Sequence, residues 1–225
     1  MSTITITPQP VEAPDIEARA VFPWPLYRMS LEQYDALVES GLFTERDRLQ
    51  LINGILVTKV TQGDDHCVAD EDCRTALQRA LPPGWFIRSN KPVDIPPDGV
   101  PEPDQAVVRG SNRDYGRKKR GRPGAKDVAL IAEVAQSSLP GDRAMVGIYG
   151  PGGIPVYWIV NLVDRQVEVY SDPGPDGYRS RQTYAEGQSV PVVIDGQPLG
   201  QIAVDDVLPA RETPDTGDEV QPPNP

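Results

Sequence analysis

The sequence predicts an α/β or α+β protein in which helices flank a mixed β-sheet and a β-meander follows near the C-terminus. Segments with the apolar spacing of helices alternate with β-prone segments in the first part of the chain. Two apolar, β-prone segments in the middle each carry an acid, and short strands separated by turns fill the last third. Helices flanking a sheet, with a meander late in the chain, are typical of this class.

The 225 residues suit one domain of moderate size with a tail at each end. Residues 1–25 are rich in proline and aperiodic, so we expect a tail that is disordered or pinned to the domain surface by its Phe-Pro-Trp-Pro run. Residues 26–209 carry the periodic segments and form the expected domain. Residues 210–225 are acidic and Pro-rich, and we expect a disordered tail there.

Composition argues against several classes of function. The net charge of -11 argues against a general nucleic-acid coat, although one local basic cluster exists. No apolar run is long enough to cross a membrane, and the N-terminus lacks a basic-then-apolar signal, so we expect a cytoplasmic protein. Two cysteines, Cys67 and Cys73, form neither a disulfide framework nor a zinc site, and a single histidine, His66, argues against triad chemistry.

The sequence of the first part of the domain predicts a helix, a hairpin and a second helix. Ser30 and Gln33 can form a capping box, and the apolar spacing that follows predicts a helix over 31–40. An Asn-Gly pair between two apolar runs predicts a tight hairpin over 48–60. Helical spacing over 65–81, closed by Pro-Pro-Gly, predicts the second helix.

The sequence of the rest of the domain predicts the strands of the mixed sheet. Proline at position 92 makes the first of its strands irregular or places it at an edge. The expected elements are, in order, a strand over 85–95, strands over 100–108 and 127–135, a short helix within 137–153, a strongly apolar strand over 155–161, and short strands over 166–170, 178–184 and 190–194 before a final segment that ends at 209.

Two acids on the middle strands are the candidate site. Asp104 lies at the entrance of one apolar strand and Glu133 lies inside the next. A carboxylate in a buried strand is costly unless it is paired or binds a cation. Two of them on neighbouring strands suit a divalent metal site for phosphodiester hydrolysis. The alternative is that Asp104 is a turn acid after Pro103 and that Glu133 is a paired buried acid.

A basic loop joins these two strands. Its Lys-Arg-Gly-Arg-Pro run at 119–123 resembles an AT-hook core, in which arginine lies along the narrow minor groove of A·T-rich DNA. A solvated basic loop is the alternative. The candidate DNA-binding residues are Arg117, Lys118, Lys119, Arg120 and Arg122.

Five motifs occur in order along the domain. They are Arg-Met-Ser-Leu-Glu-Gln-Tyr at 28–34, Leu-Gln-Leu-Ile-Asn-Gly-Ile-Leu at 49–56, Pro-Glu-Pro-Asp at 101–104, the acid-bearing strand with its continuation at 127–138, and Gly-Ile-Pro-Val-Tyr-Trp-Ile-Val-Asn at 153–161. Together they resemble the Uma family of restriction-endonuclease-like proteins, in the PD-(D/E)XK nuclease superfamily. The resemblance covers about 26–209 and implies a restriction-endonuclease-like core.

The resemblance assigns roles to individual residues. It implies that Asp104 and Glu133 hold Mg²⁺ or Mn²⁺, and that Gln50 stands where the family has a third, metal-binding acid. An amide ligates a cation less well than a carboxylate does. The family's lysine on the helix after the glutamate strand has no counterpart here, and Arg143 or Lys59 are the candidate substitutes. His66 falls where the family often has a histidine, either as a helix-entry residue or near substrate.

The leading hypothesis is therefore a cytoplasmic, bacterial-type, metal-dependent DNA endonuclease with Asp104, Glu133 and Gln50 at its site. The loss of the third acid and of the lysine makes impaired catalysis part of this hypothesis. The alternative is a non-catalytic DNA-binding or protein-interaction module on the same fold. No membrane partner is expected, and a homo-oligomer stays open.

Overall fold

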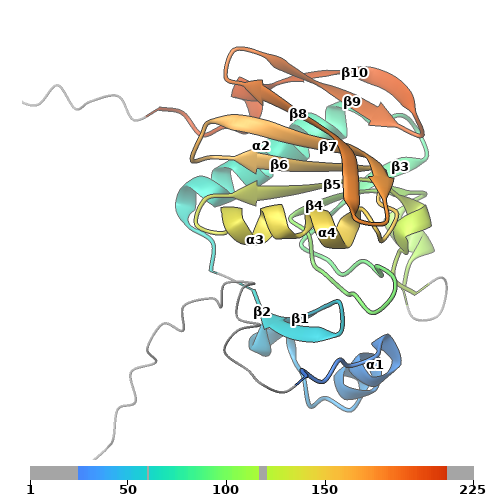
Figure 1. Cartoon of the computed structure of the whole chain (residues 1–225). Helices are drawn as coiled ribbons and strands as arrows, with labels where there is room; N and C mark the ends of the chain where they lie inside the picture. The colour runs from blue at the N-terminus through green and yellow to red at the C-terminus, as the bar shows by residue number, and fades with distance from the viewer. Residues whose placement is uncertain (1–24, 60, 117–120, 212–225) are drawn as a thin grey trace, which may run out of the picture.

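A six-stranded mixed sheet forms the centre of the protein (Figure 1). The computed structural model describes residues 25–59, 61–116 and 121–211. The strands lie in sequence order across the sheet, and only the central pair β5 and β6 runs parallel. Their bounds are Trp85–Ser89 for β3, Gln105–Arg109 for β4, Val128–Ala135 for β5, Val156–Asn161 for β6, Gln166–Gly174 for β7 and Gly177–Ala185 for β8.

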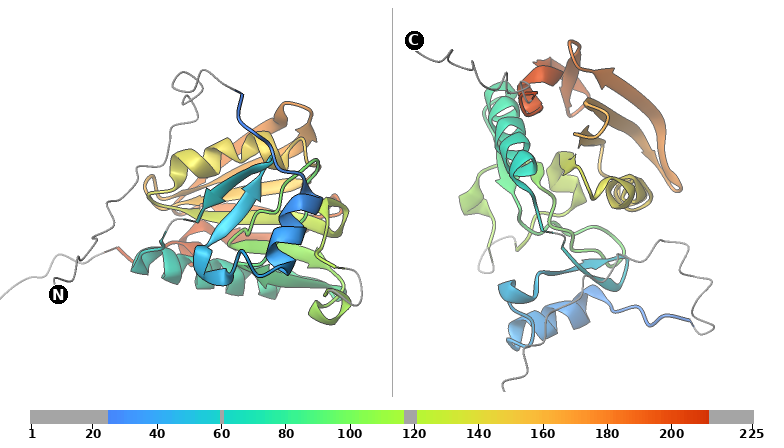
Figure 2. Two further views of the ribbon diagram at one scale, coloured as in Figure 1. Left: turned by 90° about the horizontal axis from the view of Figure 1, so that it is seen from below. Right: turned by 90° about the vertical axis from the view of Figure 1, so that its left-hand side faces the viewer.

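Two layers cover the sheet, one on each face (Figure 2). On one face lie helix α2 (Asp64–Ala80) and the hairpin of β9 (Ser189–Ile194) and β10 (Gln197–Ala203). On the other face lie the short helices α3 (Leu139–Ala144) and α4 (Val146–Tyr149). Helices α3 and α4 lie between β5 and β6 in the chain and form the crossover connection that a parallel pair of strands requires.

Successive side chains of β5 point to opposite faces of the sheet and so pack into different layers of the core. Leu130, Ala132 and Val134 pack on the α2 side, whereas Ile131 and Ala135 pack on the side of α3 and α4. Glu133 has the parity of Ile131 and Ala135, so its side chain points toward α4. A carboxylate therefore faces a layer that is otherwise built from apolar and tyrosine side chains.

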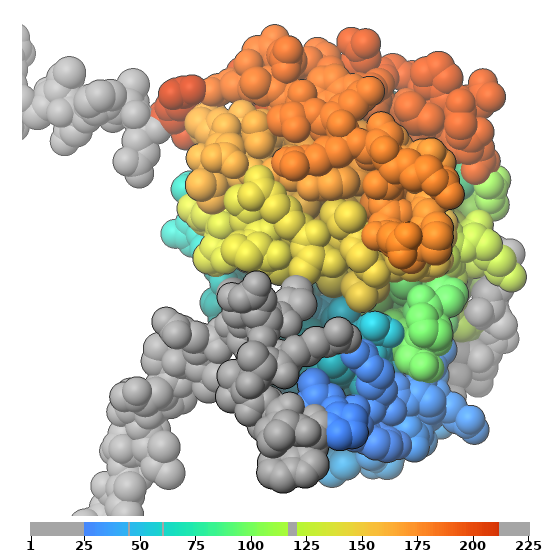
Figure 3. All heavy atoms as spheres, viewed as in Figure 1, coloured from blue at the N-terminus to red at the C-terminus, as the bar shows by residue number. Residues whose placement is uncertain are grey.

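The N-terminal unit consists of α1 (Leu31–Glu39) and the hairpin of β1 (Leu49–Ile52) and β2 (Ile55–Thr58). In Figure 3 it forms the lower part of the visible face. Tyr34, Leu51 and Val100 make its small core. The Val100 amide donates to the Leu51 carbonyl at 2.7 Å, which joins the hairpin to the segment that leads to Asp104.

The sequence predicted most of these elements. The capping box of Ser30 and Gln33, the first hairpin and the long helix are confirmed. The strand expected over 85–95 is shorter, because Asn90 takes a left-handed φ of 51° and ends the ladder after Ser89. The helix expected within 137–153 is two short helices.

The C-terminal strands divide differently from the predicted meander. Strands β7 and β8 extend the main sheet, whereas β9 and β10 form a separate two-stranded sheet. Within the described residues, no helix is long and apolar enough to cross a membrane. The two predicted tails lie almost wholly outside the described residues.

Candidate active site

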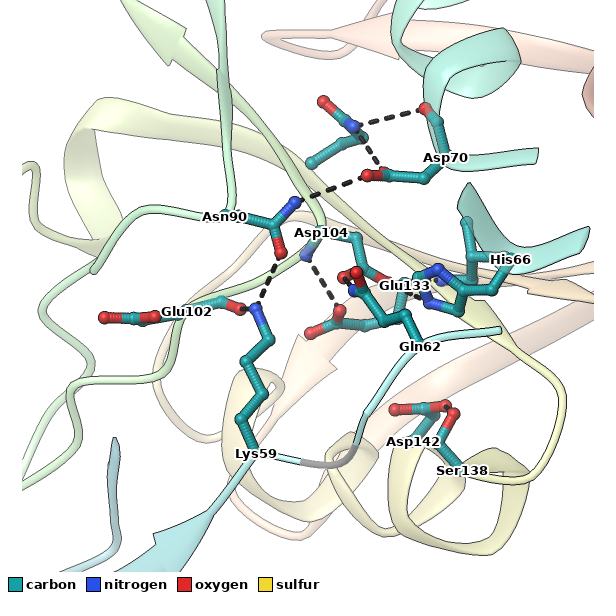
Figure 4. A network of polar contacts seen from close by, with 12 residues as sticks. Lys59, Gln62, His66, Asp70, Asn90, Glu102, Asp104, Glu133, Ser138 and Asp142 are labelled. Carbon is teal, nitrogen blue, oxygen red and sulfur yellow. Dashed lines mark hydrogen bonds and ion pairs between the residues drawn. The ribbon is translucent and has the colours of Figure 1, made fainter. Parts of the chain in front are cut away.

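The two predicted acids, Asp104 and Glu133, lie beside each other (Figure 4). Strands β4 and β5 are antiparallel neighbours with Gln105 opposite Ala132, so Asp104 lies one step further on, opposite Glu133. The Asp104 backbone N–H donates to Glu133 Oε2 at 2.9 Å. The strand register therefore fixes the two acids beside each other, as the sequence predicted.

Asp104 is the buried member of the pair, with 4% of its surface exposed. Its Oδ2 accepts from the Val134 amide at 2.9 Å and lies 3.1 Å from Nε2 of His66. Its Oδ1 accepts from Nε2 of Gln62 at 3.0 Å. These contacts hold the carboxylate in one orientation.

Glu133 is less enclosed and is held by Tyr149. The Tyr149 hydroxyl donates to Glu133 Oε1 at 2.9 Å from a fully buried ring. Burial, followed by the charges of Asp104 and Asp142, raises the pKa of Glu133 well above its usual value, against the opposing hydrogen bonds. The residue as a whole is only partly buried, unlike its neighbours in β5.

A third acid, Asp142 on α3, joins the pair electrostatically. Its Oδ2 accepts from the Ser138 hydroxyl at 2.7 Å. Burial is the main cause that raises the pKa of Asp142 to about 7, and the charge of Asp104 adds to it. The charges of Asp104 and Asp142 thus both act to raise the pKa of Glu133, and this concentration of negative charge favours a proton or a cation.

The connection from β2 to α2 supplies the polar wall of this centre. Lys59 and Gln62 lie in this connection, and His66 lies in the first turn of α2. Burial alone would lower the pKa of His66, but the hydrogen bond and charge of Asp104 and the charges of further acids raise it. The sequence left His66 between a helix-entry residue and a residue near substrate. The structure has it in the first turn of α2, and its ring contacts Asp104.

Gln50, predicted as a site residue, contacts the segment before Asp104 and not the carboxylates. Its Oε1 accepts from the Glu102 amide at 3.0 Å. That hydrogen bond fixes the backbone two residues before Asp104. In this structure Gln50 therefore supports the segment that carries the acid, and its side-chain hydrogen bond goes to neither carboxylate.

The predicted DNA-binding residues fall in two groups. Arg117, Lys118, Lys119 and Arg120 lie outside the described residues, between Gly116 and Gly121, which pair through two backbone hydrogen bonds of 3.0 and 3.1 Å. Arg122 binds within the protein: its guanidinium donates to both oxygens of Asp35, at 2.8 and 3.0 Å, and to Asp94. It ties α1 to the core, so its guanidinium is engaged within the protein.

The donor set suits a hard divalent cation. Within the described ranges, no group of three or more His, Cys, Asp or Glu side chains is arranged to enclose a metal ion. Mg²⁺ needs fewer protein ligands, since it binds through one or two carboxylates and keeps several waters or substrate oxygens. Each carboxylate oxygen has two acceptor sites. The hydrogen bonds above leave capacity on Asp104 Oδ1 and on both Glu133 oxygens.

The mixed sheet, its flanking helices and the acid pair at one sheet end define a restriction-endonuclease-like nuclease fold. The chain belongs to the Uma2 family, described as "Putative restriction endonuclease", whose family model matches residues 31–199. A crystal structure of a putative nuclease belonging to DUF820 from Anabaena variabilis has a similar fold, with a TM-score of 0.59 and 14% identity over 80% of this chain and 97% of that one. No curated protein matches the chain.

Sequence reasoning did not assign Gln62, Asp142 or Tyr149 to the site. Asp142 matched, with Arg143, an Asp-Arg pair of the family but was given no role; Tyr149 was only a residue of a short helix, and Gln62 part of a loop. The position of Asp142 could have indicated a site residue. It follows the strand that carries Glu133 by a few residues, and there the chain crosses over the end of that strand to reach the next parallel one. Gln62 carried no comparable signal, because its contact depends on the path of a connection between two units.

Proposed function

We propose that this protein is a DNA endonuclease that depends on a divalent metal, Mg²⁺ or Mn²⁺, held by Asp104 and Glu133. One observation carries the proposal: Asp104 stands opposite Glu133 in the strand register, and its backbone N–H donates to Glu133 Oε2 at 2.9 Å, with Asp142 as a third acid whose charge acts on Glu133. Membership of a family described as restriction endonucleases supports DNA as the substrate class.

The reaction adds water to a backbone phosphorus and breaks the bond from that phosphorus to one sugar oxygen, which takes up a proton. A bound divalent cation would activate the water and offset the charge that develops on the phosphate. Asp104, oriented by Gln62, His66 and the Val134 amide, is the rigid ligand. Glu133, held through Tyr149, is the more exposed ligand.

The direct test is nicking of supercoiled plasmid with Mg²⁺ or Mn²⁺. The variants Asp104→Asn and Glu133→Gln keep the size of each side chain and remove one charge. We expect both to lose nicking, whereas Asp176→Asn, in the exposed turn between β7 and β8, keeps it. Nicking that survives in both site variants would place the reaction elsewhere.

A second candidate function is a non-catalytic DNA-binding module. Two observations favour it: Gln50 replaces an acid expected from the family, and every oxygen of Asp104 and Glu133 already has a protein donor or a neighbouring imidazole. This candidate expects DNA binding through the basic loop without cleavage. Replacing Arg117, Lys118, Lys119 and Arg120 by alanine should then weaken binding and flatten its dependence on salt, as measured by fluorescence anisotropy.

A further inference from the structure

Lys59 enters the candidate active site from a different unit of the fold. It follows strand β2 in the N-terminal hairpin, and its backbone amide donates to the Arg48 carbonyl at 2.8 Å. Its side chain points away from the hairpin toward the segment before Asp104 (Figure 4). There Nζ donates to the Glu102 carbonyl at 2.9 Å and to Oδ1 of Asn90 at 2.7 Å.

Both acceptors of the Lys59 ammonium are neutral. An ammonium group has three N–H donors, so these two hydrogen bonds leave one for a further partner. In the part of the chain that the structure describes, Lys59 forms no ion pair within 4.0 Å. The side chain is half-buried. Its charge is therefore held two residues before Asp104 without a carboxylate in contact to cancel it.

A network of hydrogen bonds around Asn90 holds Lys59 in this position. Asn90 adopts a left-handed φ of 51°, a conformation that asparagine tolerates better than most residues. Its backbone N–H donates to the carbonyls of Pro103 and Asp104, each at 3.0 Å. Its side-chain amide donates to Asp70 at 3.3 Å, so Oδ1 is oriented toward Lys59. The residue that receives the ammonium is thus fixed to the same backbone that carries the catalytic acid.

Two arginines, Arg143 and Arg122, have carboxylate partners of their own. Arg143 follows Asp142 in the chain, but its guanidinium binds Glu168, which is fully buried. Arg122 is bound to Asp35 and Asp94. Drawing Arg143 away would remove one of the two arginine partners of the buried Glu168, the other being Arg181. Drawing Arg122 away would break its ion pairs with two aspartates. Lys59 can contact a ligand without such a loss.

We infer that Lys59 is a catalytic residue that contacts the phosphate to be cleaved, and that it does so from the β1–β2 hairpin. The inference rests on the proposed function for its reaction, but the phosphate contact can be tested separately. The ammonium forms no covalent bond and transfers no proton. It donates its remaining N–H to a non-bridging phosphate oxygen and offsets the negative charge that grows there.

The test compares Lys59→Gln with Lys59→Arg and Arg79→Gln. Glutamine keeps an N–H donor for the Glu102 carbonyl but removes the charge, whereas arginine keeps the charge. Arg79 is an exposed residue in the last turn of α2, about 20 Å along the helix from His66, and gives the same change of charge away from the site. Lys59→Met serves as the neutral variant if circular dichroism shows that Lys59→Gln does not fold.

Two readouts are needed. The first is binding of a short DNA duplex with Ca²⁺ as the metal, measured by anisotropy over a range of salt. Loss of one phosphate contact lowers the slope of log K against log salt by about one. We expect this decrease in Lys59→Gln, and wild-type slopes in Lys59→Arg and Arg79→Gln.

The second readout is the nicking rate with Mg²⁺ or Mn²⁺, which should fall about 100-fold in Lys59→Gln alone.

The outcomes separate this inference from the proposed function. If Lys59→Gln and Arg79→Gln have the same salt slope, the phosphate contact is wrong, whatever the nicking rate. If the slope falls but the rate does not, Lys59 binds DNA and its catalytic role is wrong. If the wild-type protein never nicks DNA, the proposed function fails, and the salt slope alone still decides whether Lys59 contacts phosphate.

Discussion

The backbone N–H of Asp104 donates to the carboxylate of Glu133 across the β4–β5 ladder, at 2.9 Å. A main-chain donor cannot swing away as a side chain can, so the relative position of the two acids follows from strand pairing. Catalytic and metal-binding groups on strands are held more precisely than groups on loops. The pair is therefore preorganised in the free protein, before any ligand binds.

Metal binding should stabilise the protein through this pair. A ligand that binds only the folded state at about 100 times its dissociation constant adds about 2.7 kcal/mol. We expect Mn²⁺ to raise the thermal unfolding midpoint of the wild-type protein and to leave the midpoint of Glu133→Gln unchanged. Differential scanning fluorimetry with and without EDTA measures both.

The control for this experiment is Asp176→Asn, which removes an acid from an exposed turn. It should respond to Mn²⁺ as the wild-type protein does. An equal shift in Glu133→Gln would show that the metal binds elsewhere, and no shift in the wild-type protein would count against the metal site.

Tyr149 should matter to metal binding as well as to stability. Its buried hydroxyl donates to Glu133 Oε1 at 2.9 Å, so Tyr149→Phe removes a donor and frees the carboxylate to rotate. We expect a loss of about 1–2 kcal/mol in the free energy of unfolding, measured by urea denaturation. We also expect weaker Mn²⁺ binding by calorimetry.

Tyr157 offers a matched control for that variant. Its ring is also fully buried, and its hydroxyl donates at 2.9 Å to a backbone carbonyl, that of Asp142. Tyr157→Phe should cost a similar amount of stability and leave Mn²⁺ affinity close to the wild-type value. If both variants bind Mn²⁺ equally well, Tyr149 has no special role in holding Glu133.

The predictable part of the fold rests on local signals. The capping box at Ser30, the Asn-Gly turn of the first hairpin and the apolar strand β6 each depend on a few neighbouring residues, and all three are confirmed. The early end of β3 was not predictable in the same way. It depends on Asn90, whose left-handed backbone is fixed by hydrogen bonds to Pro103 and Asp104, far along the chain.

The same distinction applies to the site. That Asp104 and Glu133 lie beside each other was predictable, because acids in apolar strands stand out in a sequence. Lys59 could only be offered beside Arg143 as a candidate, since choosing between them requires their partners. The structure supplies these: Glu168 for Arg143, and two neutral oxygens for Lys59.

Arg122 should contribute to stability by joining α1 to the core. Its guanidinium binds Asp35 on α1 and Asp94 in the segment after β3, and about a quarter of its side chain is exposed. Charged hydrogen bonds of this kind, discounted for exposure, contribute about 1 kcal/mol. Arg122→Ala should lower the free energy of unfolding by that amount in urea denaturation.

Arg113→Ala is the control for Arg122, because it removes an exposed arginine from the same loop. It should leave the free energy of unfolding within about 0.5 kcal/mol of the wild-type value. A double-mutant cycle of Arg122→Ala with Asp35→Asn should show coupling between the two sites. Additive effects would mean that the ion pair contributes nothing to the attachment of α1.

Glu168 should make the protein sensitive to acid. Burial alone would raise the pKa of Glu168, but hydrogen bonds from Arg143, Tyr170 and Asn161 and the charge of Arg181 lower it to about 2. A carboxyl whose pKa is lower in the folded state stabilises the protein above its unfolded pKa, near 4.5. That stabilisation is lost as the pH falls from about 4.5 toward 2, and it amounts to at most about 3 kcal/mol.

Glu168→Gln isolates this contribution. Glutamine keeps an acceptor for Arg143 and cannot ionise, so the variant should be less stable than the wild-type protein at neutral pH. Because the wild-type protein loses its advantage in acid, the difference in free energy of unfolding should shrink between about pH 4.5 and pH 2. Urea denaturation at several pH values measures it. A difference that stays constant across this range would show that Glu168 is not ionised in the folded protein at neutral pH.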